Sequence, residues 1–168
     1  NRKRPPLKHL DFVSHGLCPI VHAADDVSVM ETLEAIPHIT RSARAITGDK
    51  DYRIGPATIA MRQNPYGART IPNPDHERIC MAHDDPRHRA KFGAAYVIGL
   101  ASALASSGLS VWTPAALYGP RGVIADQGEW PISAALKALA ERAGEKVHSA
   151  RVSDGLAEAC IGTVTLKA

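Results

Sequence analysis

Apolar residues along the chain follow two spacings, one typical of buried strands and one typical of helices. Short apolar runs within residues 10–21, 52–61 and 109–113 predict three strands. Apolar residues at helical spacing predict helices over 28–48, 85–107 and 131–144. Strands that alternate with helices are typical of parallel βαβ units, so we expect three such units in succession.

Capping residues indicate where these helices begin. Ser28 and Glu31 have the spacing of a capping box at the start of the first helix. Pro37 lies inside that helix, and because proline lacks an N–H we expect a break or kink there. Asp85 followed by Pro86 predicts the start of the second helix. We expect a solvated face for the basic residues of its first turn, Arg87, His88 and Arg89.

The end of the chain has a different pattern. β-branched residues alternate over 147–152 and 163–166, with a turn signal at Asp154-Gly155, so we expect antiparallel strands. We divide the chain into a basic tail (1–9), a partial barrel domain (10–145) and a β extension (146–168). Three βα units alone would leave exposed sheet edges, which proteins normally cover.

A larger barrel would cover those edges. We therefore predict an α/β fold in which the chain is the C-terminal part, about three βα units, of a (β/α)8 TIM-type barrel followed by a short β extension. The structural alternative is a small three-layer or flavodoxin-like sheet. The chain does not begin with Met, so we expect an upstream part that completes the barrel.

Composition narrows the class of protein. The net charge is only +3 and aromatic residues make up 5% of the 168 residues. A nucleic-acid-binding protein usually has a broader basic surface with aromatic residues, so we expect no nucleic-acid partner. No apolar run approaches the roughly 18 residues that span a bilayer, so we expect no membrane partner. Three widely spaced cysteines fit a reduced, cytoplasmic protein. No nucleotide-binding or metal-ligand motif is present, so we expect no cofactor and no metal.

Polar residues follow the first predicted strand, where parallel α/β sheets place their functional groups. His22 with Asp25 or Asp26 is a candidate general acid/base pair, because a carboxylate fixes the imidazole tautomer. The alternative is that the two aspartates only cap the next helix. His15 is a candidate substrate-binding residue.

A second polar group follows the second strand and opens a long loop, residues 62–85. Arg62 offers a bidentate fork, and the amides of Gln63 and Asn64 discriminate hydroxyls. The alternative is that Asn64 starts a turn and Arg62 pairs with a structural acid. Tyr66 of this loop and Tyr118 after the third strand complete the candidate substrate-binding set.

Several runs carry a family resemblance. Residues 11–13, 18–26, 28–34, 55–56, 61–67 and 85–87 resemble D-apionate lactonases, bacterial enzymes that hydrolyse sugar lactones, and the likeness covers residues 10–122. The resemblance implies a much longer enzyme with a glycosidase-like (β/α)8 barrel and a β-rich accessory domain. Its substrate would be a D-apionolactone-like small molecule, and His22, Asp25, Asp26, Arg62 and Asn64 fall in the matching runs.

Two alternatives to a lactonase stay open. One is a TIM-barrel glycoside hydrolase, although the second strand ends in Ala60-Met61-Arg62-Gln63 without the expected carboxylate. The other is an inactive interaction or structural fragment that self-associates, for example as a homodimer.

Overall fold

The computed structural model describes residues 6–64, 66–67, 69–153, 156–161 and 164–167. A 3-10 turn at Leu7–His9 precedes three strand–helix units. They are formed by β1 (Phe12–Leu17), α1 (Asp26–Thr47), β2 (Asp51–Ala57), α2 (Lys91–Leu104), β3 (Val111–Trp112) and α3 (Pro131–Ala140).

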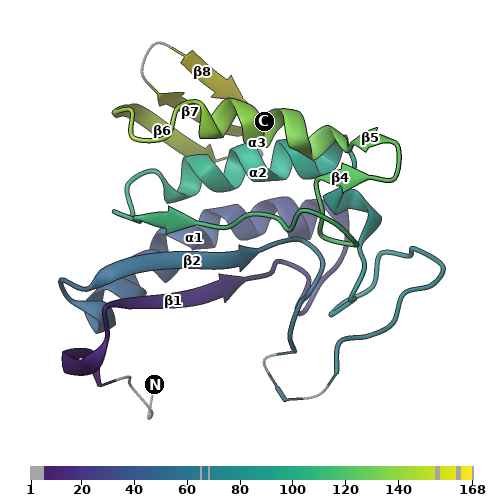
Figure 1. Ribbon diagram of the computed structural model, residues 1–168, viewed down its shortest axis with the longest axis horizontal. Coiled ribbons are helices and arrows are strands. Elements are labelled where there is room, and N and C mark those ends of the chain that lie inside the picture. The colour runs from purple at the N-terminus through teal and green to yellow at the C-terminus, as the bar shows by residue number, and fades with distance from the viewer. Residues whose placement is uncertain (1–5, 65, 68, 154–155, 162–163, 168) are drawn as a thin grey trace.

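The three strands form one parallel sheet in the order β1-β2-β3 (Figure 1). Val13 lies opposite Tyr52 in the first pair, and Ile54 lies opposite Trp112 in the second. The predicted α/β class and the parallel sheet are therefore confirmed, although β3 is only two residues long.

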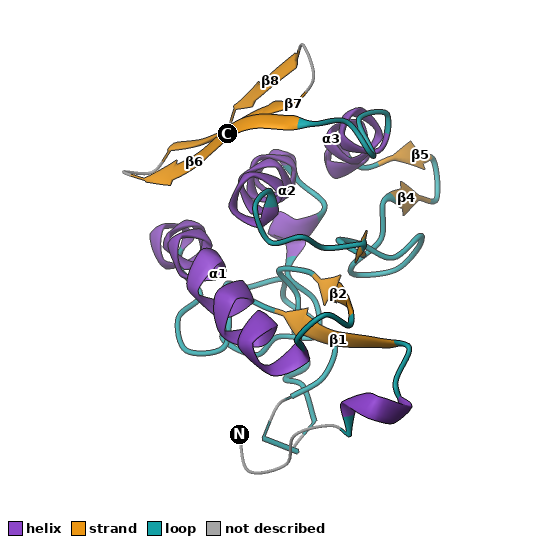
Figure 2. Cartoon of the chain, turned by 90° about the vertical axis from the view of Figure 1, so that its left-hand side faces the viewer, coloured by secondary structure: helices purple, strands orange, loops and turns teal. Residues whose placement is uncertain are grey.

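The helices α1 and α2 cover one face of this sheet (Figure 2). Tyr52 and Ile54 of β2 pack into one buried cluster with Val29 and Leu33 of α1 and Leu100 of α2. Each of these side chains is at most 1% exposed, so the burial of apolar surface fixes the helices on this face.

The opposite face of the sheet is open. Phe12 of β1 and Val111 of β3 are 43% and 44% exposed. Between them, the Arg53 guanidinium lies 3.9 Å from the Phe12 ring centroid and 2.7 Å from an Asp51 carboxylate oxygen. No helix or strand of the described residues covers this face, and β1 and β3 each have a partner strand on one side only.

The first helix differs from the sequence prediction at two places. Its N-cap is Asp25, whose carboxylate accepts a hydrogen bond from the Ser28 N–H at 2.9 Å, so the capping box with Ser28 as N-cap is wrong. Aspartate and serine are equally favourable N-cap residues, and with Asp25 as the cap the helix gains residues 26–28 at its start. The helix also continues without a break through Pro37 to Thr47, and it has buried residues both before the proline, such as Ile36, and after it, such as Thr40.

The start of the second helix also differs. Asp85 caps a 3-10 turn, Pro86–His88, and the α-helix begins only at Lys91, after an extended Ala90. Arg87 and His88 are 6% and 1% exposed, so the solvated basic face expected there is wrong for both. Both side chains have buried polar partners, Asp85 for Arg87 and the Arg121 carbonyl for His88.

Two small sheets complete the chain. A hairpin that the sequence did not predict joins β4 (Ile124–Ala125) and β5 (Gly128–Glu129). The antiparallel strands predicted at the end are confirmed as β6 (Val147–Ser153), β7 (Leu156–Ile161) and β8 (Val164–Lys167), which lie beside α2 (Figure 1). The predicted turn at residues 154–155 lies outside the described residues. None of the described helices has the length and apolarity needed to cross a membrane.

Candidate functional site

The loops that follow the three parallel strands are held together by backbone hydrogen bonds. The loop after β2 doubles back on itself through a bridge between Ile71 and Ala82. The N–H of Met81 then donates to the Ile20 carbonyl at 2.7 Å, and that of Met61 donates to the Ala82 carbonyl at 2.8 Å. These bonds hold residues 71 and 81–82 of the long loop against the chain segments that follow β1 and β2.

His22 and Tyr66 come together from two of these loops. The Tyr66 hydroxyl lies 3.3 Å from Nε2 of His22, and both side chains are exposed. Tyr66 is positioned by its own backbone N–H, which donates to the Asn64 side-chain oxygen at 2.9 Å. Water and a small solute can reach this imidazole.

The two aspartates that follow His22 are engaged elsewhere. Asp25 caps α1, and hydrogen bonds from the Ser28 side chain and backbone hold the pKa of its carboxyl below the usual value. Asp26 lies between two guanidinium groups, 2.9 Å from Arg78 and 2.9 Å from Arg87. Within the described residues, His22 forms no hydrogen bond with either carboxylate.

His15 is directed into the sheet–helix layer. Its Nε2 lies 2.7 Å from the hydroxyl of buried Tyr52, and its Nδ1 lies 3.0 Å from the Gly16 carbonyl. Since a carbonyl only accepts, Nδ1 carries the proton in the neutral ring and the tyrosine donates to Nε2. Burial raises the pKa of Tyr52, which keeps this donor protonated.

Arg62 and Gln63 are exposed and line two cavities. The larger, about 830 Å³, runs along the free edge of β1 past Ser14 and His15. The smaller, about 410 Å³, lies under the long loop beside Asn64. Asn64 itself is 6% exposed and donates to the Arg69 carbonyl at 3.4 Å, so it stabilises the loop.

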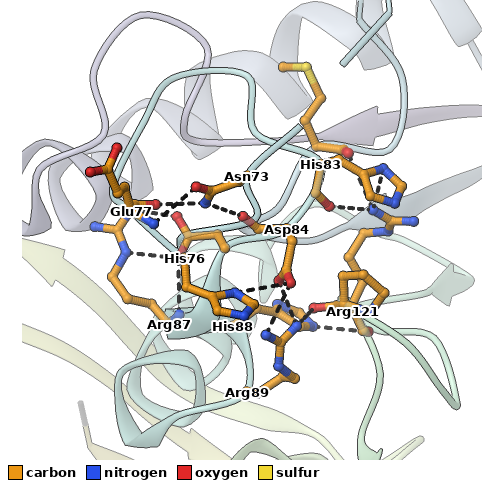
Figure 3. A network of polar contacts seen from close by, with 12 residues as sticks. Asn73, His76, Glu77, His83, Asp84, Arg87, His88, Arg89 and Arg121 are labelled. Atoms are coloured by element: carbon orange, nitrogen blue, oxygen red, sulfur yellow. Dashed lines mark hydrogen bonds and ion pairs between the residues drawn. The ribbon is translucent and has the colours of Figure 1, made fainter. Parts of the chain in front are cut away.

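A buried ion network that sequence reasoning missed supports these loops (Figure 3). Asp85 is fully buried and accepts hydrogen bonds at 3.0 Å and 2.6 Å from Nε and Nη2 of Arg87. Burial opposes the charge on Arg87, but Asp85 and Asp26 together raise its pKa. Arg87 thereby links the loop after β2 to the start of α1.

A second part of the network involves the next basic residue. Arg89 pairs with Asp84 at 2.7 Å and also donates to the Pro120 carbonyl at 2.7 Å. The His76 ring lies 3.3 Å from the same carboxylate. The only sequence signal for these pairs was the closeness of Asp84-Asp85 to Arg87-His88-Arg89, which fits helix capping equally well.

Arg121 connects the loop after β3 to the loop after β2. Its guanidinium donates to the carbonyls of His83 at 2.7 Å and Met61 at 3.3 Å (Figure 3). Burial, with the nearby charge of Arg62, lowers the pKa of Arg121. The Nε2–H of buried His88 donates to the Arg121 carbonyl at 3.1 Å, and burial lowers the pKa of His88 to about 4.

The loops after the strands carry two groups of accessible, hydrogen-bonding side chains, the His22–Tyr66 pair and the residues around the smaller cavity, which together we call the strand-end rim. It consists of His22, Arg62, Gln63, Tyr66, His83 and Arg121. Tyr118 lies in the loop after β3 and is 68% exposed. The rim offers a solvent-accessible imidazole together with cationic and amide donors, which can bind a carbonyl oxygen and hydroxyl groups. Among the described residues, no group of three or more His, Cys, Asp or Glu is placed to hold a metal ion.

Comparisons with known proteins identify a family and a relative for this chain. Residues 1–144 match the sequence model of a family described as D-apionate lactonase, TIM barrel domain. A D-apionate lactonase of Brucella anthropi is 51% identical over 152 residues, which cover 86% of this chain and 25% of that protein. The chain therefore spans about a quarter of the length of this relative, and no solved structure matches it. The chain belongs to the D-apionate lactonase TIM barrel domain family.

Proposed function

We propose that this chain supplies three βα units of a (β/α)8 barrel whose strand-end rim opens a sugar lactone with water. The observation that carries the proposal is that loops following parallel strands bear both the His22–Tyr66 contact and a cavity lined by Arg62, in a chain of this family. Barrel enzymes place their active sites at this end of the strands.

Barrel closure is supported by the open side of the sheet. Phe12 and Val111 are exposed on the face opposite the helices, where a closed barrel would bury side chains from all its strands. The free edges of β1 and β3 would each pair with a further strand. The Brucella anthropi relative is about four times longer than its match, which leaves room for the remaining units.

In this proposal His22 is the general base. Its imidazole takes a proton from water as the water oxygen attacks the lactone carbonyl carbon. The tetrahedral intermediate then loses the ring C–O bond, and the imidazolium returns the proton to the departing ring oxygen. The product is a hydroxy acid that ionises to its carboxylate. Nδ1 is the basic nitrogen in this scheme, because Nε2–H donates to the Tyr66 hydroxyl, which orients the His22 ring.

Arg62 is the group that binds the developing oxyanion. An exposed guanidinium beside Gln63 can donate to the carbonyl oxygen while the amide binds a neighbouring hydroxyl. Tyr118 would bind a more distant hydroxyl, and Asn64 would act through the loop that it stabilises. His15 would complete the wall of the larger cavity.

Asp25 and Asp26 are positioning residues in this scheme and take no part in the proton transfer. Asp25 caps α1 and Asp26 is bound by Arg78 and Arg87, so together they fix the loop that carries His22. This supports an imidazole base over a free carboxylate. It also gives no support to a glycosidase, which needs two available carboxyl groups at the cleavage point.

The test is lactone opening by the intact protein that contains this chain. His22→Asn and Arg62→Gln should each lower kcat/KM by about 100-fold or more, the usual effect of removing a general base or an oxyanion donor. His38→Asn and Arg41→Gln, which change an exposed histidine and arginine of α1, are matched controls and should leave kcat/KM unchanged. Near-normal rates for both rim variants would remove the assignment.

A further inference from the structure

The smaller cavity at the rim is lined by positive and neutral side chains only. Its lining consists of Arg62, Gln63, Asn64, Arg69, Thr70, Pro72 and His83, with no carboxylate among them. Arg121 adjoins it, because its guanidinium donates to the His83 carbonyl. The charge of Arg62 is also near enough to lower the pKa of Arg121. The proposed lactone chemistry uses only one of these cations.

The arginines of this cavity differ from others on the same loops. Arg78, Arg87 and Arg89 are each bound to an aspartate at 2.6–2.9 Å. Arg62 and Arg121, by contrast, form no ion pair with any residue that the structure describes. The loops therefore pair their structural arginines with aspartates and leave Arg62 and Arg121 without an ion pair, although the Asp84 carboxylate is near enough to favour the charge on Arg121.

Arg121 is held in place from both ends. Its carbonyl accepts from the His88 ring and from the Ala116 N–H, and its Nη1 donates to two carbonyls, those of His83 and Met61. Within the described residues, Nε and Nη2 have no partner, so these donors of the fork stay available. A guanidinium that is already ordered loses little side-chain entropy when it binds an anion.

We propose that Arg62, Arg121 and His83 form a subsite for the carboxylate of an open-chain sugar acid, the hydrolysed form of the lactone. This rests on the proposed function, since ring opening converts a neutral substrate into such an anion at the same rim. Planar guanidinium forks match carboxylates, and an anion between two arginines relieves their mutual repulsion. The rim should therefore hold its product more tightly than a neutral sugar of the same size.

The cavity favours a carboxylate over a phosphate. No lysine lines it, and the loop after β3 lacks the strand-to-helix glycine loop that cradles phosphates. Gln63 and Asn64 offer amides, which suit the hydroxyl groups along a sugar-acid chain. A phosphorylated sugar is nevertheless the other source of an anion, so the experiment includes one.

The experiment is isothermal titration of the intact protein with sodium D-gluconate, sorbitol, glucose 6-phosphate and sodium sulfate. Gluconate should bind, sorbitol should bind at least 10-fold more weakly, and added salt should weaken gluconate binding. Arg121→Gln and Arg62→Gln should each raise the gluconate Kd about 10- to 100-fold, the usual value of a charge-assisted hydrogen bond. Arg121→Lys should fall in between, because it keeps the charge and loses the fork.

Arg41→Gln is the matched control, since it removes one positive charge from the exposed side of α1, and its gluconate Kd should stay unchanged. If Arg121→Gln fails to fold, the gluconate Kd of Arg62→Gln provides the test, because Arg62 is exposed. Equal binding of sorbitol, tighter binding of glucose 6-phosphate, or sulfate binding as strongly as gluconate would each overturn the carboxylate subsite. Gluconate binding without lactone opening would support the subsite and count against the proposed function, whereas lactone opening without gluconate binding would overturn the subsite alone.

Discussion

Two ion pairs of similar geometry lie in opposite surroundings in this protein. Asp85 is fully buried with Arg87, whereas the Asp51–Arg53 pair is about one third exposed on the open face of the sheet. In both pairs the aspartate precedes the arginine by two residues, and the closest N–O distance is 2.6 Å in one and 2.7 Å in the other. Their contributions to stability should nevertheless differ, because removing one partner of a buried pair leaves an uncompensated charge.

We therefore expect Asp85→Asn to lower the free energy of unfolding by about 3–5 kcal/mol. Asp51→Asn is the matched control, and its effect should be much smaller because solvent screens the exposed pair. Urea unfolding of both variants, followed by circular dichroism, makes the comparison. Equal losses would mean that the buried network does not hold the loops together.

His88 gives a pH-dependent prediction. An unfolded histidine takes up a proton near pH 6.5, whereas burial lowers the pKa of folded His88 to about 4. Between these values the unfolded state binds more protons, so the free energy of unfolding falls as the pH drops from 6.5 to 4, by up to about 3 kcal/mol from this residue.

The measurement compares unfolding of the wild type and His88→Gln between pH 4 and 7. Glutamine can still donate to the Arg121 carbonyl but does not titrate, so the variant should lose stability less steeply toward low pH. His38→Gln, at an exposed position of α1, should keep the wild-type slope. Parallel curves for wild type and His88→Gln would show that His88 is protonated equally in both states.

Residue roles were predictable from the sequence where local chemistry decides them. The two possible readings of Asp25 and of Asn64 were both visible, and the structure shows Asp25 as a helix cap and Asn64 in a turn. The burial of Arg87 and His88 was not predictable. It depends on Asp26 and on the Arg121 carbonyl, both more than 30 residues away in the sequence.

Helix α1 shows how packing overrides a local signal. Pro37 lies at an exposed position in the middle of the helix, yet the helix continues for another ten residues to Thr47. Leu33 and Ile36 are buried against the sheet, and their burial offsets the hydrogen bond that proline cannot donate. The spacing of apolar residues predicted the extent of this helix better than the proline did.

Replacing this proline should stabilise the protein. Pro37→Ala restores an N–H donor and should raise the free energy of unfolding by about 1–3 kcal/mol. Glu34→Ala, at another exposed position of α1, is the control and should change stability by only a few tenths of a kcal/mol, about the size of a propensity difference. Thermal unfolding of both variants decides the point, and a destabilised Pro37→Ala would show that the proline is required where it lies.

Strand existence was easier to predict than strand length. Residues 109–113 were expected as a full strand, but β3 comprises only Val111–Trp112, although Ser110 and Thr113 on either side also form backbone hydrogen bonds with β2. The hairpin of β4 and β5 was missed, because two-residue strands carry too little alternation to be recognised. Both elements flank the loop that carries Arg121, and the part that this residue plays in the site was not predicted from the sequence.

At the scale of the whole molecule, β1 and β3 each have a partner strand on one side only among the described residues. An unpaired strand edge can pair with another chain, so the 168-residue chain on its own should associate as its concentration rises. Light scattering during size-exclusion chromatography measures this. A chain that stays monomeric at high concentration would contradict the expectation.

A charged residue on the open edge should reduce that association. Ser14→Lys places a charge on an exposed position of β1, a common means of blocking edge pairing. Ser42→Lys adds the same charge on the exposed side of α1 and should leave association unchanged. Equal association of the two variants would locate the contact away from β1.

The most direct test of the central claim is a crystal structure of the intact protein with a bound open-chain sugar acid. The account predicts that β1 and β3 each pair with a further parallel strand in a closed barrel. It also predicts that the ligand lies within hydrogen-bond distance of Arg62 and close to His22. A sheet that ends at β1 or β3, or a ligand bound away from these side chains, would contradict it.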